Sequence, residues 1–242
     1  ATGYDPEAMD ILWQKMLELP VRKDFPFNEP NDLDAIRAAR VPGPRKVDLP
    51  YDDEQLFDRL YGAWLGRCAG CALGKPVEGF MQPYNGLSSK QRIKEYLVGI
   101  SPSEYPIRDY IPQHSPAEEK TGKVGCYRST REQIAFMESD DDIRYTVLGQ
   151  KVFREVGHSF TTYDMMRLWI NNLPYSMVCT AETQAYLNFV RRYQVHMQMW
   201  RTPSAELDRQ IDWNWVATNE NAFREWIGAQ IRADHFGYAA PG

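Results

Sequence analysis

Hydrophobic residues recur at intervals of three and four along most of the chain, which is the spacing of an amphipathic helix. The clearest case begins at Asp52, where the apolar positions are Phe57, Leu60, Tyr61, Trp64, Leu65, Cys68 and Ala72. The same spacing predicts helices over residues 6–19, 88–97, 142–156, 162–171, 180–200 and 221–233. No stretch alternates between apolar and polar residues as a strand would. The pattern therefore predicts a mainly α fold.

Two segments interrupt the helical pattern. Prolines and charges dominate residues 20–50, which predicts an extended arm. Residues 100–131 hold four prolines and show no period, so we expect a long loop. Loops of that length inside a compact domain are often functional. We therefore divide the chain into an N-terminal helical arm and linker, residues 1–50, and an all-α domain, residues 51–242.

Glycines interrupt the helix that follows Asp52 at a regular spacing. Gly62, Gly66, Gly70 and Gly74 repeat every four residues and so form one stripe along the helix. Each glycine costs a helix interior roughly 0.8–1 kcal/mol relative to alanine. This cost predicts a compensating contact, either the close approach of another helix backbone or a ligand.

Composition excludes several classes of protein. The chain has 242 residues and a formal net charge of −5, which argues against a general nucleic-acid binder because such proteins present a basic face. It shows no apolar run long enough to span a membrane and no signal-peptide pattern, so the default location is cytoplasmic. Four cysteines do not make a disulfide framework, and Cys68 and Cys71 are expected to be small packing residues beside the glycines. The four scattered histidines give little support to a His-based triad.

An acidic run starts where the long loop turns into the next helix. Glu138, Asp140, Asp141 and Asp142 place four carboxylates in five positions, with Ser139 among them. One interpretation is a helix cap, since Ser and Asp are good N-caps and an acidic first turn favours the helix dipole. The other is a metal site, because two carboxylates ~6 Å apart at an effective dielectric of ~20 repel by about 3 kcal/mol. Oxygen ligands of this kind suit Mg²⁺ or Mn²⁺ better than Zn²⁺.

One helical family with aspartate-rich motifs fits poorly. Terpene and prenyl synthases carry DDxxD and a later NxxxSxxxE to hold a diphosphate through Mg²⁺. Here the position that closes the first motif is Arg144, and the nearest second motif, which starts at Asn172, ends in Thr180 instead of Glu. An Asp-rich diphosphate enzyme is therefore the less favoured hypothesis.

A second family matches at three places in the same order. Residues 58–78, DRLYGAWLGRCAGCALGKPVE, resemble the opening helix of the ADP-ribosylglycohydrolases, DRLxGAxLGxAxGDALGxPxE. Residues 139–142, SDDD, resemble that family's (S/T)DDT metal motif, and residues 228–232, GAQIR, are similar to its GAAMR substrate-loop element. The resemblance covers residues 52–242.

This resemblance implies an all-α fold, a compact orthogonal helical bundle, with two Mg²⁺ or Mn²⁺ ions in a central cleft. It implies hydrolysis of an N- or O-glycosidic ADP-ribosyl bond on a modified protein or an ADP-ribose-like small molecule. By position, Ser139, Asp140 and Asp141 would be metal ligands and Glu78 the catalytic group at the cleft. Gly228 and Arg232 would bind the substrate, and Tyr110 in the long loop is a candidate to stack on adenine.

The chain departs from the family pattern in three ways. Cys71 stands where the family often has Asp, and Asp142 replaces the Thr of the metal motif. The family's later DxDT or DxDS motif has no counterpart before Gly242, so we expect a domain that is incomplete at its C-terminus and a metal site with part of its ligands. The expected alternatives are a fragment, one piece of a cleaved enzyme, a subunit whose site a second polypeptide completes, and a non-catalytic relative that has a structural or ADP-ribose-binding role.

Overall fold

The computed structural model describes residues 5–193 and 202–240, which form two units. Of these residues, 5–49 belong to the first unit, and the second begins at Pro50. In the first unit, helix α1 (Pro6–Leu17) starts at Asp5, whose carboxylate accepts hydrogen bonds from the Glu7 and Ala8 amides. The helix predicted over residues 6–19 is thus confirmed at its start and ends two residues earlier than predicted.

The arm predicted as extended contains a helix. α2 (Leu33–Ala39) is capped by Asp32, which accepts a hydrogen bond from the Ala35 amide at 2.8 Å. Prolines surround this segment, but none lies within it, and an Asp cap is sufficient to start a short helix. The prediction of an extended arm is therefore wrong for these seven residues and right for most of the others.

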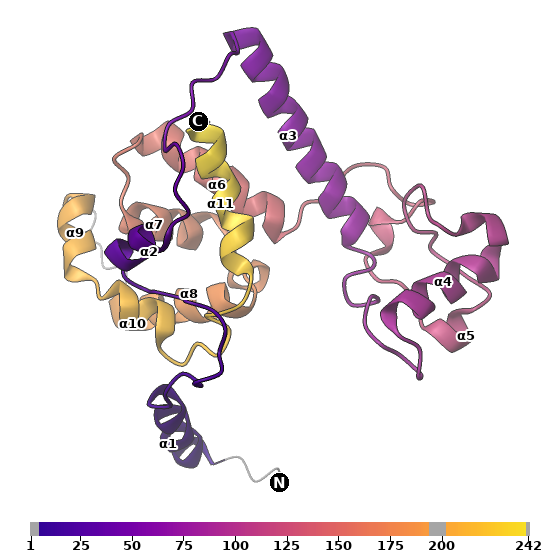
Figure 1. Ribbon diagram of the computed structural model, residues 1–242, viewed down its shortest axis with the longest axis horizontal. Coiled ribbons are helices and arrows are strands. Elements are labelled where there is room, and N and C mark those ends of the chain that lie inside the picture. The colour runs from indigo at the N-terminus through magenta and orange to yellow at the C-terminus, as the bar shows by residue number, and fades with distance from the viewer. Residues whose placement is uncertain (1–4, 194–201, 241–242) are drawn as a thin grey trace. The chain divides into compact units, whose positions relative to one another are not determined.

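The second unit opens with the long helix α3 (Asp53–Gly74), drawn as one rod in Figure 1. A capping box fixes its start, because Asp52 accepts from the Gln55 amide while the Gln55 side chain accepts from the Asp52 amide. The helix buries only Ala72. Phe57 and Tyr61, on its apolar face, stack on each other and border an apolar hollow of about 320 Å³ shared with α6 and α11.

The expectation of close packing along the glycine stripe is wrong. A Cβ atom added at Gly62, Gly66, Gly70 or Gly74 would meet nothing within 4 Å. No helix backbone approaches the stripe among the described residues. Three of these glycines instead border the cleft described below.

A small lobe follows α3. It contains α4 (Ser89–Ile100), η1 (Pro102–Glu104), α5 (Glu118–Thr121) and η2 (Tyr127–Ser129), and the chain between them is largely irregular, as predicted. Its core consists of Phe80, Tyr96, Leu97, Ile111 and Val124. Buried Arg92 ties the lobe together by donating to the Phe80, Gln82 and Thr121 carbonyls.

The remaining helices form a bundle around a larger core. They are α6 (Asp141–Val156), α7 (Thr162–Asn172), η3 (Tyr175–Met177), α8 (Thr180–Tyr193), α9 (Ser204–Gln210), α10 (Trp213–Thr218) and α11 (Gly228–Ala239). Figure 1 shows α6 and α11 side by side, and Tyr145, Trp169 and Phe189 lie in the core between the helices.

The hydrophobic pattern predicted the bounds of most of these helices well, but it predicted the helices in the last part of the chain poorly. The helices predicted over 142–156 and 162–171 are confirmed within one residue, and α8 confirms the start of the one over 180–200, whose residues 194–200 lie outside the described residues. The helix predicted over 221–233 is wrong in its bounds, because residues 221–227 form turns and α11 starts at Gly228. The short helices α9 and α10 were not predicted, since six or seven residues show too little periodicity.

Within residues 5–193 and 202–240 the structure has no strand beyond one isolated bridge between Tyr84 and Leu87. The all-α fold class is therefore confirmed. Among the same residues, no helix combines the length and the apolar character that crossing a bilayer requires.

The two kinds of glycine environment predict opposite effects of alanine. At Gly149 in α6, an added Cβ would lie against the ring of His235, which is 4% exposed and packs from α11. We expect Gly149→Ala to lower the free energy of unfolding by about 1–3 kcal/mol through overpacking. We expect Gly62→Ala, which faces open space, to raise it by about 0.5–1 kcal/mol. Urea denaturation measures both, and an equal change in the two variants would contradict this packing.

Candidate active site

The C-terminal half of α3 and the N-terminal end of α6 border a cleft of about 520 Å³. The residues that line this cleft come from two segments of the chain, which lie more than sixty positions apart in the sequence. Its lining residues are Gly66, Arg67, Gly70, Cys71, Gly74, Lys75, Glu78, Asp140, Asp141 and Asp142. Of the two contacts that the glycine stripe predicts, a helix or a ligand site, the structure is compatible with the second, because side-chain-free positions leave room on the α3 side of this cleft.

The acidic run caps α6. Asp140 is the N-cap and has extended backbone angles, and its Oδ1 accepts a hydrogen bond from the Asp141 amide at 3.1 Å. Asp141 Oδ1 in turn accepts from the Asp142 amide at 3.2 Å. The capping interpretation is thus confirmed. Capping is not the only feature of the acidic run, because all three aspartates also line the cleft.

The position of Asp141 makes its carboxyl harder to ionise. Burial raises the pKa of Asp141 above its usual value, and the neighbouring charges of Asp140 and Asp142 raise it further. The amide hydrogen bonds that cap the helix act in the opposite direction and do not cancel the shift. A cation placed among these oxygens would relieve the repulsion.

Two basic side chains reach the acidic run, Arg67 from α3 and Lys75 from the C-cap of that helix. Lys75 Nζ lies 3.5 Å from Asp140 Oδ2 and 3.4 Å from Glu138 Oε2, and it donates to the Ser139 carbonyl. Burial alone would lower the pKa of Lys75, but the Asp140 and Glu138 carboxylates outweigh it and raise that pKa. Arg67 donates to the Asp142 carbonyl at 3.1 Å and forms an ion pair with Asp234 of α11.

Two thiols belong to the same neighbourhood. Cys71 lies beside the glycines, as expected, and lines the cleft with them. Burial, then Asp142 and Asp140, raise its pKa to about 11, and the side chain is a neutral thiol at physiological pH. Burial and the charges of Asp141, Asp140 and Glu78 likewise raise the pKa of the exposed Cys179.

The cleft gathers part of the site that the family resemblance implies. Glu78, Asp140 and Asp141 all line it. The Ser139 side chain is exposed and does not line it, although the Ser139 carbonyl accepts hydrogen bonds from Lys75 and from Arg144. The role of Ser139 as a ligand stays a prediction.

The three predicted substrate residues lie elsewhere. Tyr110 is in the lobe, where its carbonyl accepts a hydrogen bond from Arg131 Nε at 3.1 Å. Arg232 forms an ion pair with the buried Glu182 and lies 5.7 Å from the centre of the Trp169 ring. Gly228 is the first residue of α11, and a Cβ there would meet the Glu182 carboxylate. None of the three lines the cleft.

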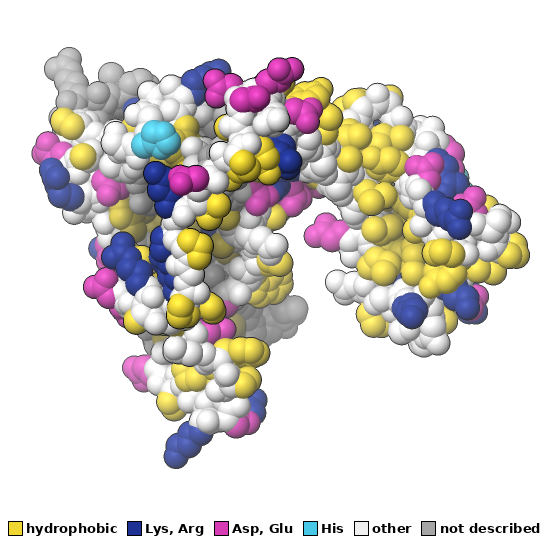
Figure 2. Space-filling model, turned by 45° about the horizontal axis from the view of Figure 1, so that its top comes forward, with side chains coloured by type: hydrophobic (Ala, Val, Ile, Leu, Met, Phe, Trp, Pro, Cys, Tyr) yellow, Lys and Arg dark blue, Asp and Glu magenta, His cyan; other side chains and the backbone are white. Residues whose placement is uncertain are grey.

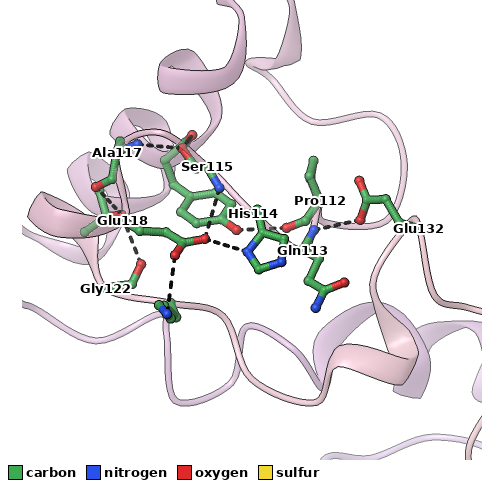
Figure 3. Close-up of polar contacts among 11 residues, drawn as sticks. Pro112, Gln113, His114, Ser115, Ala117, Glu118, Gly122 and Glu132 are labelled. Carbon is green, nitrogen blue, oxygen red and sulfur yellow. Dashed lines mark hydrogen bonds and ion pairs between the residues drawn. The ribbon is translucent and has the colours of Figure 1, made fainter.

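A group in the lobe superficially resembles a catalytic triad. Figure 3 shows the Glu118 carboxylate close to the His114 ring, with Oε1 3.1 Å from Nδ1, and beside the Ser115 backbone amide. The Ser115 hydroxyl, however, donates to the Tyr96 carbonyl at 2.6 Å and not to the imidazole. The arrangement caps the turn before α5 and does not activate a nucleophile, in agreement with the low support for a His-based triad.

The sequence analysis did not predict the two basic residues of the cleft, Arg67 and Lys75. One face of α3, alongside the glycines, carries Arg67, Cys71 and Lys75, which are spaced four apart. That spacing was visible in the sequence. The spacing did not indicate a function, because the sequence does not show that the start of α6 lies opposite that face.

The donor set fits a hard divalent cation in its chemistry, because carboxylate oxygens dominate the cleft. Within the part of the chain that the structure describes, no three His, Cys, Asp or Glu side chains stand together as a formed metal site. Asp140 and Asp141 would therefore hold only part of a coordination sphere.

The distribution of charge agrees with the acidic net charge. On the face that Figure 2 shows, Lys and Arg side chains are scattered among Asp and Glu and do not gather in one patch. The structure thus offers no extended basic surface on that face. The cleft holds the four carboxylates of Glu78, Asp140, Asp141 and Asp142 against the two basic side chains of Arg67 and Lys75.

Comparison with known proteins identifies the family. The family model described as ADP-ribosylglycohydrolase matches residues 52–241, which include α3, the acidic run and α11. No curated protein and no solved structure gives a significant match. The family match covers well over half of the chain, agrees with the all-α fold, and includes both segments that form the cleft. This chain therefore belongs to the ADP-ribosylglycohydrolase family.

Proposed function

We propose that the chain hydrolyses the N- or O-glycosidic bond between ADP-ribose and an acceptor, with Mg²⁺ or Mn²⁺ bound in the acidic cleft. The observation that supports this most directly is the convergence of Glu78 with Asp140 and Asp141 on one cleft. Glycosidic cleavage passes through an oxocarbenium-like transition state, which nearby negative charge stabilises. The acceptor is a modified protein side chain or a small molecule.

Each acidic residue has a distinct role in this proposal. Glu78 is exposed and lines the cleft, and in this proposal it accepts the proton of the attacking water. Asp140 and Asp141, with Ser139, would hold the metal, which supplies Lewis acidity toward water and sugar hydroxyls when bound. Asp142 adds a carboxylate that keeps the cleft negative where Cys71 contributes none.

The coordination of the metal must be completed from outside this set. With one oxygen from each of the two aspartates and the serine, about half of the six positions that Mg²⁺ prefers have no protein ligand. We propose that water, the substrate diol or a second polypeptide fills them.

A second candidate function also follows from the incomplete set of metal ligands. With no formed three-ligand group in the described residues and a neutral thiol at Cys71, the chain would also suit a role as a non-catalytic module that binds ADP-ribose. In that case the cleft recognises the sugar without activating water.

Calorimetric titration with ADP-ribose separates the two functions. We expect the chain to bind ADP-ribose in the presence of Mg²⁺, and the binding to be lost with EDTA and in the Asp140→Ala, Asp141→Ala double variant. Binding that persists unchanged in EDTA and in the variant would favour the non-catalytic module. Equal binding of inorganic diphosphate, with no preference for the ribose, would contradict both and favour the diphosphate-enzyme hypothesis.

A further inference from the structure

The cleft already contains a cation of its own. The Lys75 side chain is 13% exposed, and its ammonium group lies within 3.5 Å of one carboxylate oxygen each of Asp140 and Glu138. Lys75 is the C-cap of α3, so the negative end of the helix dipole also favours its charge there. The ammonium group thus lies beside a carboxylate that we assign to the metal.

The other basic residue of the lining is engaged differently. Arg67 contacts the Asp142 backbone carbonyl and pairs with Asp234, which does not line the cleft. Among the residues that line the cleft, Lys75 alone pairs with a carboxylate of the acidic run. Four carboxylates against these two basic groups leave a charge of −2 in the lining.

Lysine is better suited than arginine to act as a counter-ion that a metal ion can displace. Its ammonium is a point charge on a flexible four-carbon stem, whereas a guanidinium binds carboxylates in a fixed, two-pronged geometry. The 3.4 and 3.5 Å contacts are long for charge-assisted hydrogen bonds. The lysine therefore neutralises the acids without locking them.

We propose that Lys75 is a built-in counter-ion that occupies the cation position beside Asp140 and competes with the divalent metal for it. This inference rests on the proposed function, since it assumes that Asp140 binds metal. Lys75 would then keep the unliganded cleft neutral enough to fold and set the metal affinity at a lower value than the acids alone would reach.

Mn²⁺ titration, followed by calorimetry and by the electron paramagnetic resonance signal of free Mn²⁺, tests the proposal without any activity measurement. We expect Lys75→Met to bind Mn²⁺ about tenfold more tightly than the unmodified chain, a change of about 1.4 kcal/mol. Lys75→Arg keeps the charge and should not bind Mn²⁺ more tightly. Lys151→Met is a matched control, because it removes the same charge from an α6 lysine that pairs with Glu155. Its Mn²⁺ affinity should be unchanged.

The same series distinguishes failure of this inference from failure of the proposed function. If Asp140→Asn weakens Mn²⁺ binding but Lys75→Met leaves it equal or weaker, the metal site stands and the competing lysine is refuted. If neither the unmodified chain nor Lys75→Met binds Mn²⁺, the metal-dependent function itself is refuted. In the Asp140→Asn background, Lys75→Met should have little further effect, because the contested carboxylate is gone. Circular dichroism spectra confirm that each variant is folded.

Discussion

Replacing Asp140 and Asp141 together by asparagine is expected to lower kcat/KM for ADP-ribosyl hydrolysis by at least about 10³-fold, because the metal contributes several kcal/mol of transition-state stabilisation. Asparagine is a good N-cap, so α6 should still form. Release of ADP-ribose from a modified protein, measured at saturating Mg²⁺, gives the rate.

The stability of the same variant separates chemistry from folding. The pKa of Asp141 is raised in the folded chain, chiefly by burial. A carboxyl with a raised pKa costs the fold stability once it ionises, so its contribution is favourable below the ordinary pKa and is lost as pH rises through the folded pKa. Without Asp141, this loss of stability at neutral pH should disappear.

Asp53→Asn, at the equivalent first position of α3, is the control variant and should leave the rate of hydrolysis unchanged. Retention of most activity in the double variant would refute the metal assignment.

Glu78→Gln is expected to lower kcat by about 10²–10⁴-fold, the usual contribution of a general base. Metal-dependent binding of ADP-ribose should persist, because the amide keeps the shape of the side chain and the aspartates are untouched. Single-turnover kinetics measure the chemical step, and calorimetry measures the binding.

A matched variant tests whether the effect belongs to the cleft. Glu119→Gln changes an exposed glutamate in α5 that does not line the cleft, and its kcat should stay within about twofold of the unmodified chain. If Glu78→Gln behaves like Glu119→Gln, the proton acceptor lies elsewhere and the role of Glu78 is lost.

Helical periodicity predicted most of the fold because it is a local property. The 3.6-residue repeat and the caps at Asp52 and Asp140 depend only on neighbouring residues, and α3 and α6 begin where those signals lie. Short helices are different. α9 and α10 have seven and six residues, and α11 begins seven residues after the predicted start, because packing against α6 and α8 decides where it forms.

The glycine stripe shows the limit of a local argument. Its spacing correctly indicated that one face of α3 is bare, and the energetic cost correctly demanded a reason. Sequence alone left open whether a helix or a ligand site faces the stripe. The structure leaves it open toward a cleft, with the acidic run of α6 on the other side.

The amino-acid sequence by itself determined the helical class, the caps and the acidic run with its oxygen chemistry, because each of these follows from neighbouring residues. The tertiary structure alone decided which charges meet. It brought Glu78 and Lys75 to the acidic run, and it placed Arg232 against Glu182 and Tyr110 in the lobe. Electrostatic interaction depends on distance through space, and separation along the chain carries no information about that distance until the helices pack.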